Sequence, residues 1–156
     1  MEADFAALPA ADRYHLLTNF VGPRPIALVT TLNPDGTANA APMSFFNVIS
    51  HDPPLLVIGI QPRKDGRPKD TLANLRRTGE FSVNMVDLAL APAMATTAMP
   101  VEPGVDELAL ANLTALPGAS VACPRISESP CAMECRVERL IDWPQRTLVI
   151  GEVFAM

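Results

Sequence analysis

RPIALVTTLNPDGTANAAPM, residues 24–43, predicts two strands joined by a tight turn. The first strand, over 24–32, is rich in β-branched and aliphatic residues, which favour extended structure. The four residues NPDG at 33–36 then supply the Asx, proline and glycine chemistry of a tight turn. The returning strand, over 37–43, has small side chains that either leave room for a ligand close to the backbone or face a neighbouring element. The stretch therefore predicts a β-hairpin.

Outside this hairpin the chain predicts further strands with short helices between them. Strands are expected over 55–60, 80–86, 131–141 and 147–156, with a short one near 120–123, and helices over 12–20, 70–78, 87–99 and 105–113. These strands do not alternate regularly with long helices, which argues against a doubly wound parallel sheet. We therefore expect a mainly β fold, a mostly antiparallel barrel with a few short inserted helices.

Local patterns add detail to three of these elements. Residues 55–60 are apolar throughout, so this strand is expected to be buried on both faces. Residues 80–86 alternate between apolar and polar, as a half-buried strand does. Because of Pro92, the helix over 87–99 is expected to be broken or short, since proline lacks the N–H that a helix interior needs.

The composition is that of one soluble globular domain of 156 residues, with 49% hydrophobic and 19% charged residues. The net charge of −5 argues against nucleic acid as the main partner, because phosphate backbones need a cationic face. The start lacks a signal-peptide pattern, and no apolar run approaches the ~18 residues that cross a bilayer. We therefore expect a cytoplasmic protein with reduced thiols and no membrane segment.

The segment PMSFFNVIS, residues 42–50, is the first candidate site. Its backbone groups and the hydroxyls of Ser44 and Ser50 can meet the edge of a planar heterocycle, while Phe45 or Phe46 covers the face. Asn47 can donate and accept at once, which suits the alternating edge of a pyrimidine ring. The alternative is a strand-to-loop corner with two core phenylalanines and an Asn-capped turn.

The segment RKDGRPKDT, residues 63–71, is the second candidate site. Four cations precede a helix start, where free N–H groups and the helix dipole already favour an anion. Arg63 and Lys69 could hold a phosphate, Thr71 could add its hydroxyl, and Asp70 would cap the helix or orient a base. The segment lacks the glycine pattern of a P-loop, so a nucleoside triphosphate is not implied. The alternative is a solvated surface loop.

We expect no metal site and assign no general acid or base. Cys123, Cys131 and Cys135 form no CxxC pair and have no histidine nearby, and the last two would face one side of a strand as core residues. His51 and Asp52 precede two prolines and fit a turn better than a catalytic pair. The GxSxG motif of a hydrolase nucleophile is absent.

RPIALVTTLNPDGTANAAPMSFFNVISHDPPLLVIGI, followed by RKDGRPKDTLANLRRTGEFSVNMV, closely resembles the flavin reductase-like family with the FMN-binding split-barrel fold. Its most specific pieces are APMSFFNVIS before DPP, and KDTLANLRRTGEFSVN. The resemblance implies a homodimeric, Greek-key antiparallel split β-barrel with noncovalent FMN near the subunit interface. It implies that residues 44–47 contact the isoalloxazine ring and that Thr30 or Thr31 approaches the flavin. It also implies that Arg63, Lys69, Asp70 and Thr71 lie near the ribityl phosphate.

The chemistry implied by this resemblance is reduction of flavin by NADH or NADPH, feeding a partner oxygenase or another acceptor. The alternatives are a noncatalytic flavin-binding electron carrier and an FMN-dependent oxidase of the pyridoxamine-phosphate-oxidase type, whose defining basic residues are not evident. Family members usually continue past the GEV strand, whereas this chain stops inside the apolar stretch GEVFAM. We therefore expect a single domain over 1–156 that is either shortened at its C-terminus or covered at that edge by a partner.

Overall fold

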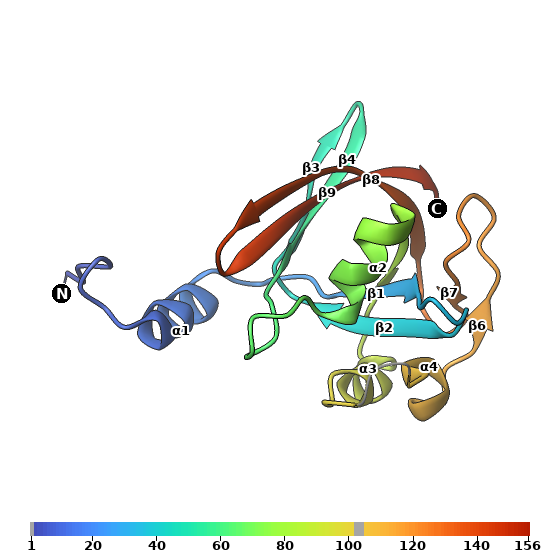
Figure 1. Cartoon of the computed structure of the whole chain (residues 1–156), viewed down its shortest axis with the longest axis horizontal. Coiled ribbons are helices and arrows are strands. Elements are labelled where there is room, and N and C mark those ends of the chain that lie inside the picture. The colour runs from blue at the N-terminus through green and yellow to red at the C-terminus, as the bar shows by residue number, and fades with distance from the viewer. Residues whose placement is uncertain (1, 102–104) are drawn as a thin grey trace.

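The computed structural model describes residues 2–101 and 105–156, and its centre is one antiparallel sheet. The strands of this sheet are β1 (Ala27–Leu32), β2 (Ala38–Met43), β3 (Phe46–His51), β4 (Pro54–Ile60), β5 (Glu80–Met85), β8 (Ala132–Trp143) and β9 (Arg146–Ala155). Their order is β2-β1-β5-β8-β9-β4-β3, and the sheet curls into an open half-barrel (Figure 1). The predicted mainly β, antiparallel split barrel is therefore confirmed.

The remaining elements are short and lie around this sheet. They are α1 (Ala10–Phe20), α2 (Asp70–Thr78), α3 (Ala91–Thr97), α4 (Glu107–Leu110) and a small sheet of β6 (Ala115–Leu116) with β7 (Arg125–Ile126). Helix α2 contacts β1 and β2, while α3 and α4 contact β2. Helix α1 projects away from the sheet (Figure 1) and has no buried residue. None of the described helices is long and apolar enough to cross a membrane.

The hairpin predicted over 24–43 is confirmed as β1 and β2, paired from Ala27 opposite Met43 to Leu32 opposite Ala38. Its turn is closed by a hydrogen bond of 3.0 Å from the N–H of Gly36 to the carbonyl of Asn33. Gly36 has a φ of 86°, a conformation that side chains disfavour, so glycine is needed there.

Strand β1 is buried on both faces, and its two faces belong to two hydrophobic cores. The inner core includes Val29, Leu75 of α2 and Phe81 of β5. The outer core includes Leu28 and Ala40 of β2, which pack with α3 and α4. The small side chains of β2 therefore face neighbouring helices at this point, and β2 is the edge strand of the sheet on which those helices pack.

Two predictions of strand burial are wrong, and each has a physical reason. Strand β4 alternates, with Leu56, Ile58 and Ile60 fully buried and the residues between them only half-buried or exposed, because only one of its faces meets the inner core. Strand β5 is instead buried on both faces. Its polar side is covered by the segment after β6, since the side-chain oxygen of Asn84 accepts a 2.8 Å hydrogen bond from the N–H of Ile126.

One prediction of local structure is confirmed and another is wrong. The helix expected within 87–99 is short, since α3 spans only Ala91–Thr97. Pro92 does not interrupt it, because it lies in the first turn, where its missing N–H has no helical partner to lose. The short strand expected near 120–123 does not form there. The N–H groups of Ser120 and Val121 bind the carboxylate of Glu134 instead of a neighbouring strand, and the short strands lie at β6 and β7.

Candidate functional site

The largest of the cavities described, about 700 Å³, lies where β2, the loop before α2 and the end of α3 meet. Residues 39–43 of β2 form one wall, and Arg63, Lys64 and Lys69 lie along the loop side. The first turn of α2 and Glu107 of α4 complete the lining. A cavity of this size suits a small organic cofactor. Four of the predicted site residues, Arg63, Lys69, Asp70 and Thr71, line it together.

The N-terminus of α2 opens into this cavity without a side-chain cap. Lys69 occupies the N-cap position with extended backbone, and its side chain makes no capping hydrogen bond. The predicted cap at Asp70 or Thr71 is therefore wrong. The carboxylate of Asp70 binds the guanidinium of Arg63 at 2.8 Å instead. The first-turn N–H groups of α2 thus remain available to an anion, together with the positive end of the helix dipole.

The cations of the loop have different surroundings. Arg67 pairs with Asp65 at 2.7 Å and does not line the cavity. Arg63 lines it with its charge balanced by Asp70. Lys64 and Lys69 are exposed and line the cavity, and neither forms an ion pair with any residue of the described ranges. Lys64 was missed from the sequence, because a run of cations does not say which side chains point inwards.

A buried network of amides and hydroxyls holds the first turn of α2 against β1 and β2. The side-chain N–H₂ of Asn39 donates to the hydroxyl oxygens of Thr31 (3.2 Å) and Thr71 (3.1 Å). The amide of Asn74 also donates to Thr31, at 3.1 Å, and to Asn33, at 2.9 Å. Because Thr71 accepts from Asn39, its own O–H can donate to a ligand in the cavity. Thr31 is fully buried and supports this arrangement from behind.

Glu107 of α4 also lines the cavity and was likewise missed from the sequence. Its side chain is buried, and its Oε2 accepts a 3.1 Å hydrogen bond from the N–H of Ala40. Burial raises the pKa of this carboxyl, against the lowering effect of the Ala40 hydrogen bond, and the neighbouring Asp70 and Asp106 raise it further. A short helical pattern gives no sign that one of its carboxylates is turned inwards.

The segment 44–50 lies outside the lining of this cavity. Phe46 is part of the inner core. The guanidinium of Arg146 lies over the ring of Phe45, 4.3 Å from the ring centroid. Asn47 is exposed, and its side-chain oxygen accepts from the next backbone N–H at 2.8 Å. Ser44 is half-buried and directly follows Met43, which does line the cavity, so the segment begins where the cavity wall ends.

The hydroxyl of Ser50, the last candidate of this segment, accepts a 3.2 Å hydrogen bond from the N–H of Asp52. This bond helps to close the turn between β3 and β4. Ser50 therefore already has one partner in the chain and lies at the far end of β3 from Ser44.

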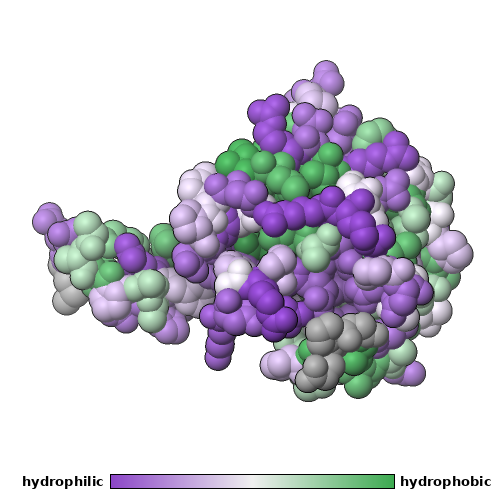
Figure 2. Space-filling model, viewed as in Figure 1, coloured by the Kyte–Doolittle hydropathy of each residue, from purple (hydrophilic) through white to green (hydrophobic). Residues whose placement is uncertain are grey.

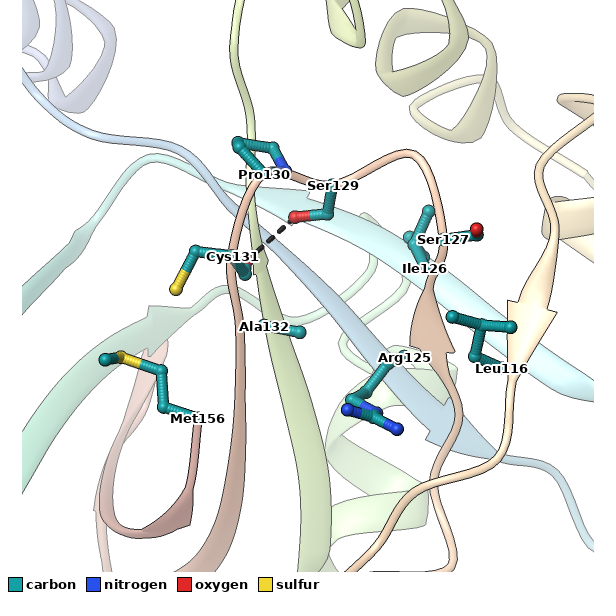
Figure 3. Close-up of a pocket in the computed structure, with 9 residues that line it drawn as sticks. All are labelled: Leu116, Arg125, Ile126, Ser127, Ser129, Pro130, Cys131, Ala132 and Met156. Atoms are coloured by element: carbon teal, nitrogen blue, oxygen red, sulfur yellow. Dashed lines mark hydrogen bonds between the residues drawn. The ribbon is translucent and has the colours of Figure 1, made fainter.

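A second cavity, about 320 Å³, lies beside β7 and contains none of the predicted site residues (Figure 3). Arg125, Cys131 and Met156 are among its lining residues.

Burial raises the pKa of Cys123 to about 11 and that of Cys135 to about 12, so both thiols are protonated at neutral pH. Within residues 2–101 and 105–156, no cluster of three or more His, Cys, Asp or Glu side chains could hold a metal ion.

Residues 22–156 match the model of the family described as flavin reductase like domain. Protein YwrF of Bacillus subtilis, which is uncharacterized, is 45% identical over 86% of this chain. A flavin reductase (NADH) of Kitasatospora aureofaciens is 33% identical over 85% of this chain. The chain spans only 65% of the length of each of these two relatives.

The structure is also similar to the crystal structure of nitrilotriacetate monooxygenase component B from Bacillus cereus. The TM-score is 0.95 at 35% identity, over 99% of this chain and 79% of that one. The half-barrel, the match of 135 residues to the family model and these relatives agree with one another. The chain belongs to the flavin reductase like domain family.

Proposed function

We propose that this chain binds FMN noncovalently and serves as an NAD(P)H-dependent flavin reductase, which passes electrons to a flavin or to a partner oxygenase. The observation that carries this proposal is the meeting of Lys64, Lys69 and the uncapped N-terminus of α2 in one cavity. Backbone N–H groups, a helix dipole and two unpaired ammonium groups are the donors that a phosphate monoester needs.

In this proposal the phosphate of FMN lies at the first turn of α2. Lys69 and Lys64 supply charge, and the O–H of Thr71 donates to a phosphate oxygen. Asp70 fixes the guanidinium of Arg63 at 2.8 Å, so Arg63 meets the phosphate in one orientation. Bound FMN would itself supply the redox chemistry, and the protein binds it, orients it and limits the access of water.

The isoalloxazine ring is proposed to extend along β2 towards Ser44. Support comes from the wall at 39–43, which leads directly to the segment 44–47. Phe45 and Asn47 would then meet the ring at the rim, and Ser50, at the far end of β3, would meet it only where the ring extends along that strand. Thr31 would act through Asn39, which it holds in place. No residue is proposed as a general acid or base.

The nicotinamide substrate and the oxygenase partner are supported by the names of two relatives. One is described as a flavin reductase (NADH) and another as component B of a monooxygenase. Since the chain spans 65% of the length of the first, both features are proposals for this protein.

A homodimer is proposed because α1 exposes apolar residues and meets the rest of the described chain only in part, through Tyr14 and Phe45, whose ring centroids are 6.3 Å apart. Tyr14, Leu17 and Phe20 are exposed on α1, Phe20 by 82%. Figure 2 shows this segment as a separate lobe that carries green apolar residues among purple ones. An exposed apolar helix is stabilised when a second surface covers it, and a second copy of the chain is the proposed surface.

The test is the visible spectrum of the purified protein with added FMN, before and after anaerobic NADH or NADPH. Binding should change the flavin absorption, and one of the nucleotides should bleach it. Failure to bind added FMN would overturn the proposal as a whole. If FMN binds but neither nucleotide reduces it, the protein is a flavin-binding electron carrier and not a reductase.

A further inference from the structure

The lining of the cavity includes a carboxylate that the phosphate does not use. Glu107 lines the cavity although its residue is only 8% exposed. Its Oε2 accepts a 3.1 Å hydrogen bond from the N–H of Ala40, and no other residue of the described ranges donates to its Oε1. Its other oxygen, Oε1, therefore has acceptor capacity left in a cavity wall.

Burial disfavours the charged form of Glu107, as its raised pKa indicates. Removing a carboxylate from water costs several kcal/mol unless hydrogen bonds replace the lost hydration. The bond to Ala40 alone would be satisfied by a neutral amide oxygen in the same position. A carboxylate at this place is better explained by a second donor that arrives with a ligand.

We propose that Glu107 is a ligand-contact residue, whose Oε1 accepts a hydrogen bond from a neutral donor group of the molecule that fills the cavity. The proposal rests on the flavin-binding function proposed above. The matching donors of a flavin are the hydroxyls of its polyol chain and its ring N–H. The lining of the cavity then offers both donors, the ammonium groups and helix N–H groups, and an acceptor, the carboxylate of Glu107.

The carboxylate gives the cavity a preference between ligands. A second anionic group beside Glu107 would meet a negative carboxylate, so ligands with one phosphate are favoured over those with more. The contact also concerns a part of the ligand that FMN and riboflavin share. Losing it should therefore weaken both flavins by the same factor.

The experiment compares wild type with Glu107→Gln, measuring the Kd of FMN and of riboflavin by flavin fluorescence at neutral pH. Gln keeps the size of the side chain and an oxygen for Ala40 but lacks the charge. The expected result is a loss of about tenfold or more for both flavins, as for a hydrogen bond to a charged group. The matched control is Glu138→Gln, which makes the same change of charge on the exposed side of β8 and should leave both Kd values unchanged.

A second measurement does not depend on the variant. In wild type, riboflavin affinity should fall as pH is lowered through the raised pKa of Glu107, because the neutral acid is a weaker acceptor. Asp70 in the first turn of α2 and Asp106 at the N-cap of α4 raise the pKa of Glu107, and Arg63, Lys64 and Lys69 are the other charged residues of the cavity lining. Glu107→Gln should abolish this pH dependence, whereas a pH dependence that arises from Asp70 or Asp106 would persist in the variant.

The outcomes separate the two proposals. If wild type binds neither flavin, the flavin-binding proposal is wrong, and the proposed role of Glu107 is wrong with it. If wild type binds both flavins and Glu107→Gln binds them equally well, only the proposed role of Glu107 is wrong. If Glu107→Gln does not fold, a riboflavin affinity of wild type that is constant with pH overturns the inference, and one that falls with acid supports it.

Discussion

The side-chain amide of Asn39 donates to the hydroxyl of Thr71 across 3.1 Å, and so joins β2 to the first turn of α2. Both residues are buried and both line the main cavity. The same amide reaches Thr31 on β1. The orientation of the proposed phosphate-binding turn is therefore set by the hairpin and not by the mobile end of a long side chain.

Thr71→Val should weaken FMN binding by about tenfold and leave riboflavin binding nearly unchanged. Valine keeps the shape of threonine but removes the O–H that is free to donate, a loss of about 1–2 kcal/mol for a bond to a charged acceptor. It also removes the oxygen that accepts from Asn39, whose amide keeps its bond to Thr31. Fluorescence titration with both flavins measures the difference. Thr71→Ser, which restores the hydroxyl, should recover most of the FMN affinity, and a failure to do so would point to packing instead.

Lys64→Ala combined with Lys69→Ala should weaken FMN by at least about tenfold more than riboflavin, and should flatten the salt dependence of FMN binding. Both ammonium groups line the cavity without an ion-pair partner among the described residues. The control is Arg67→Ala, in the same loop, because Arg67 pairs with Asp65 away from the cavity. If Arg67→Ala weakens FMN binding as much as the double lysine change, FMN affinity depends on the net charge of the loop and not on the two lysines that line the cavity.

Glu134→Gln should destabilise the fold by roughly 2 kcal/mol at neutral pH. The residue is almost fully buried, and burial alone would raise its pKa. The N–H groups of Ala119, Ser120 and Val121, with the guanidinium of Arg125, outweigh burial and lower the pKa below its ordinary 4.5.

A lowered pKa in the folded state stabilises the protein above the ordinary value, and this contribution is lost as pH falls through the lowered value. Urea unfolding should therefore show the wild type and Glu134→Gln converging below about pH 4. Glu128→Gln is the matched control, since that carboxylate also accepts a backbone N–H but is exposed. A difference that persists unchanged in acid would rule out the ionic contribution.

Leu17→Ser combined with Phe20→Ser should convert the proposed dimer into a monomer while leaving the thermal stability of the sheet unchanged. Neither side chain packs inside the chain, where they are exposed by 47% and 82%. Sedimentation measures the change of mass, and circular dichroism checks the fold. Arg13→Ser on the same helix is the control. A wild type that already sediments as a monomer would contradict the homodimer itself.

The sequence predicted those features that depend on local chemistry. The turn at 33–36 and the end of α2 at Gly79 follow from glycines with positive φ, and both were confirmed. Helix α2 was predicted with its observed limits, Asp70–Thr78. The cations of the cavity were predicted as a group because they are contiguous in the chain.

Features that depend on tertiary contacts could not be predicted in this way. Strand β5 alternates in sequence, yet the segment around Ile126 covers its polar side through Asn84. Asp70 was expected to cap α2, but Arg63 takes its carboxylate. Glu107 resembles any surface glutamate until α4 is folded against β2. Each outcome depends on a partner more than five residues away, which no local pattern contains.

The loop at 119–121, which binds the carboxylate of Glu134, also bears on where dissolved anions can bind this protein. Three successive backbone N–H groups form a cradle of the kind that also opens at the N-terminus of α2. In the first cradle the carboxylate is tethered to the chain, and its effective concentration exceeds that of any dissolved anion. Sulfate or phosphate ions therefore cannot displace it, and anion exchange is left to the turn beside Lys69. Similar groups of backbone N–H donors thus bind a carboxylate of the chain permanently at Glu134 and an exchangeable anion at the N-terminus of α2.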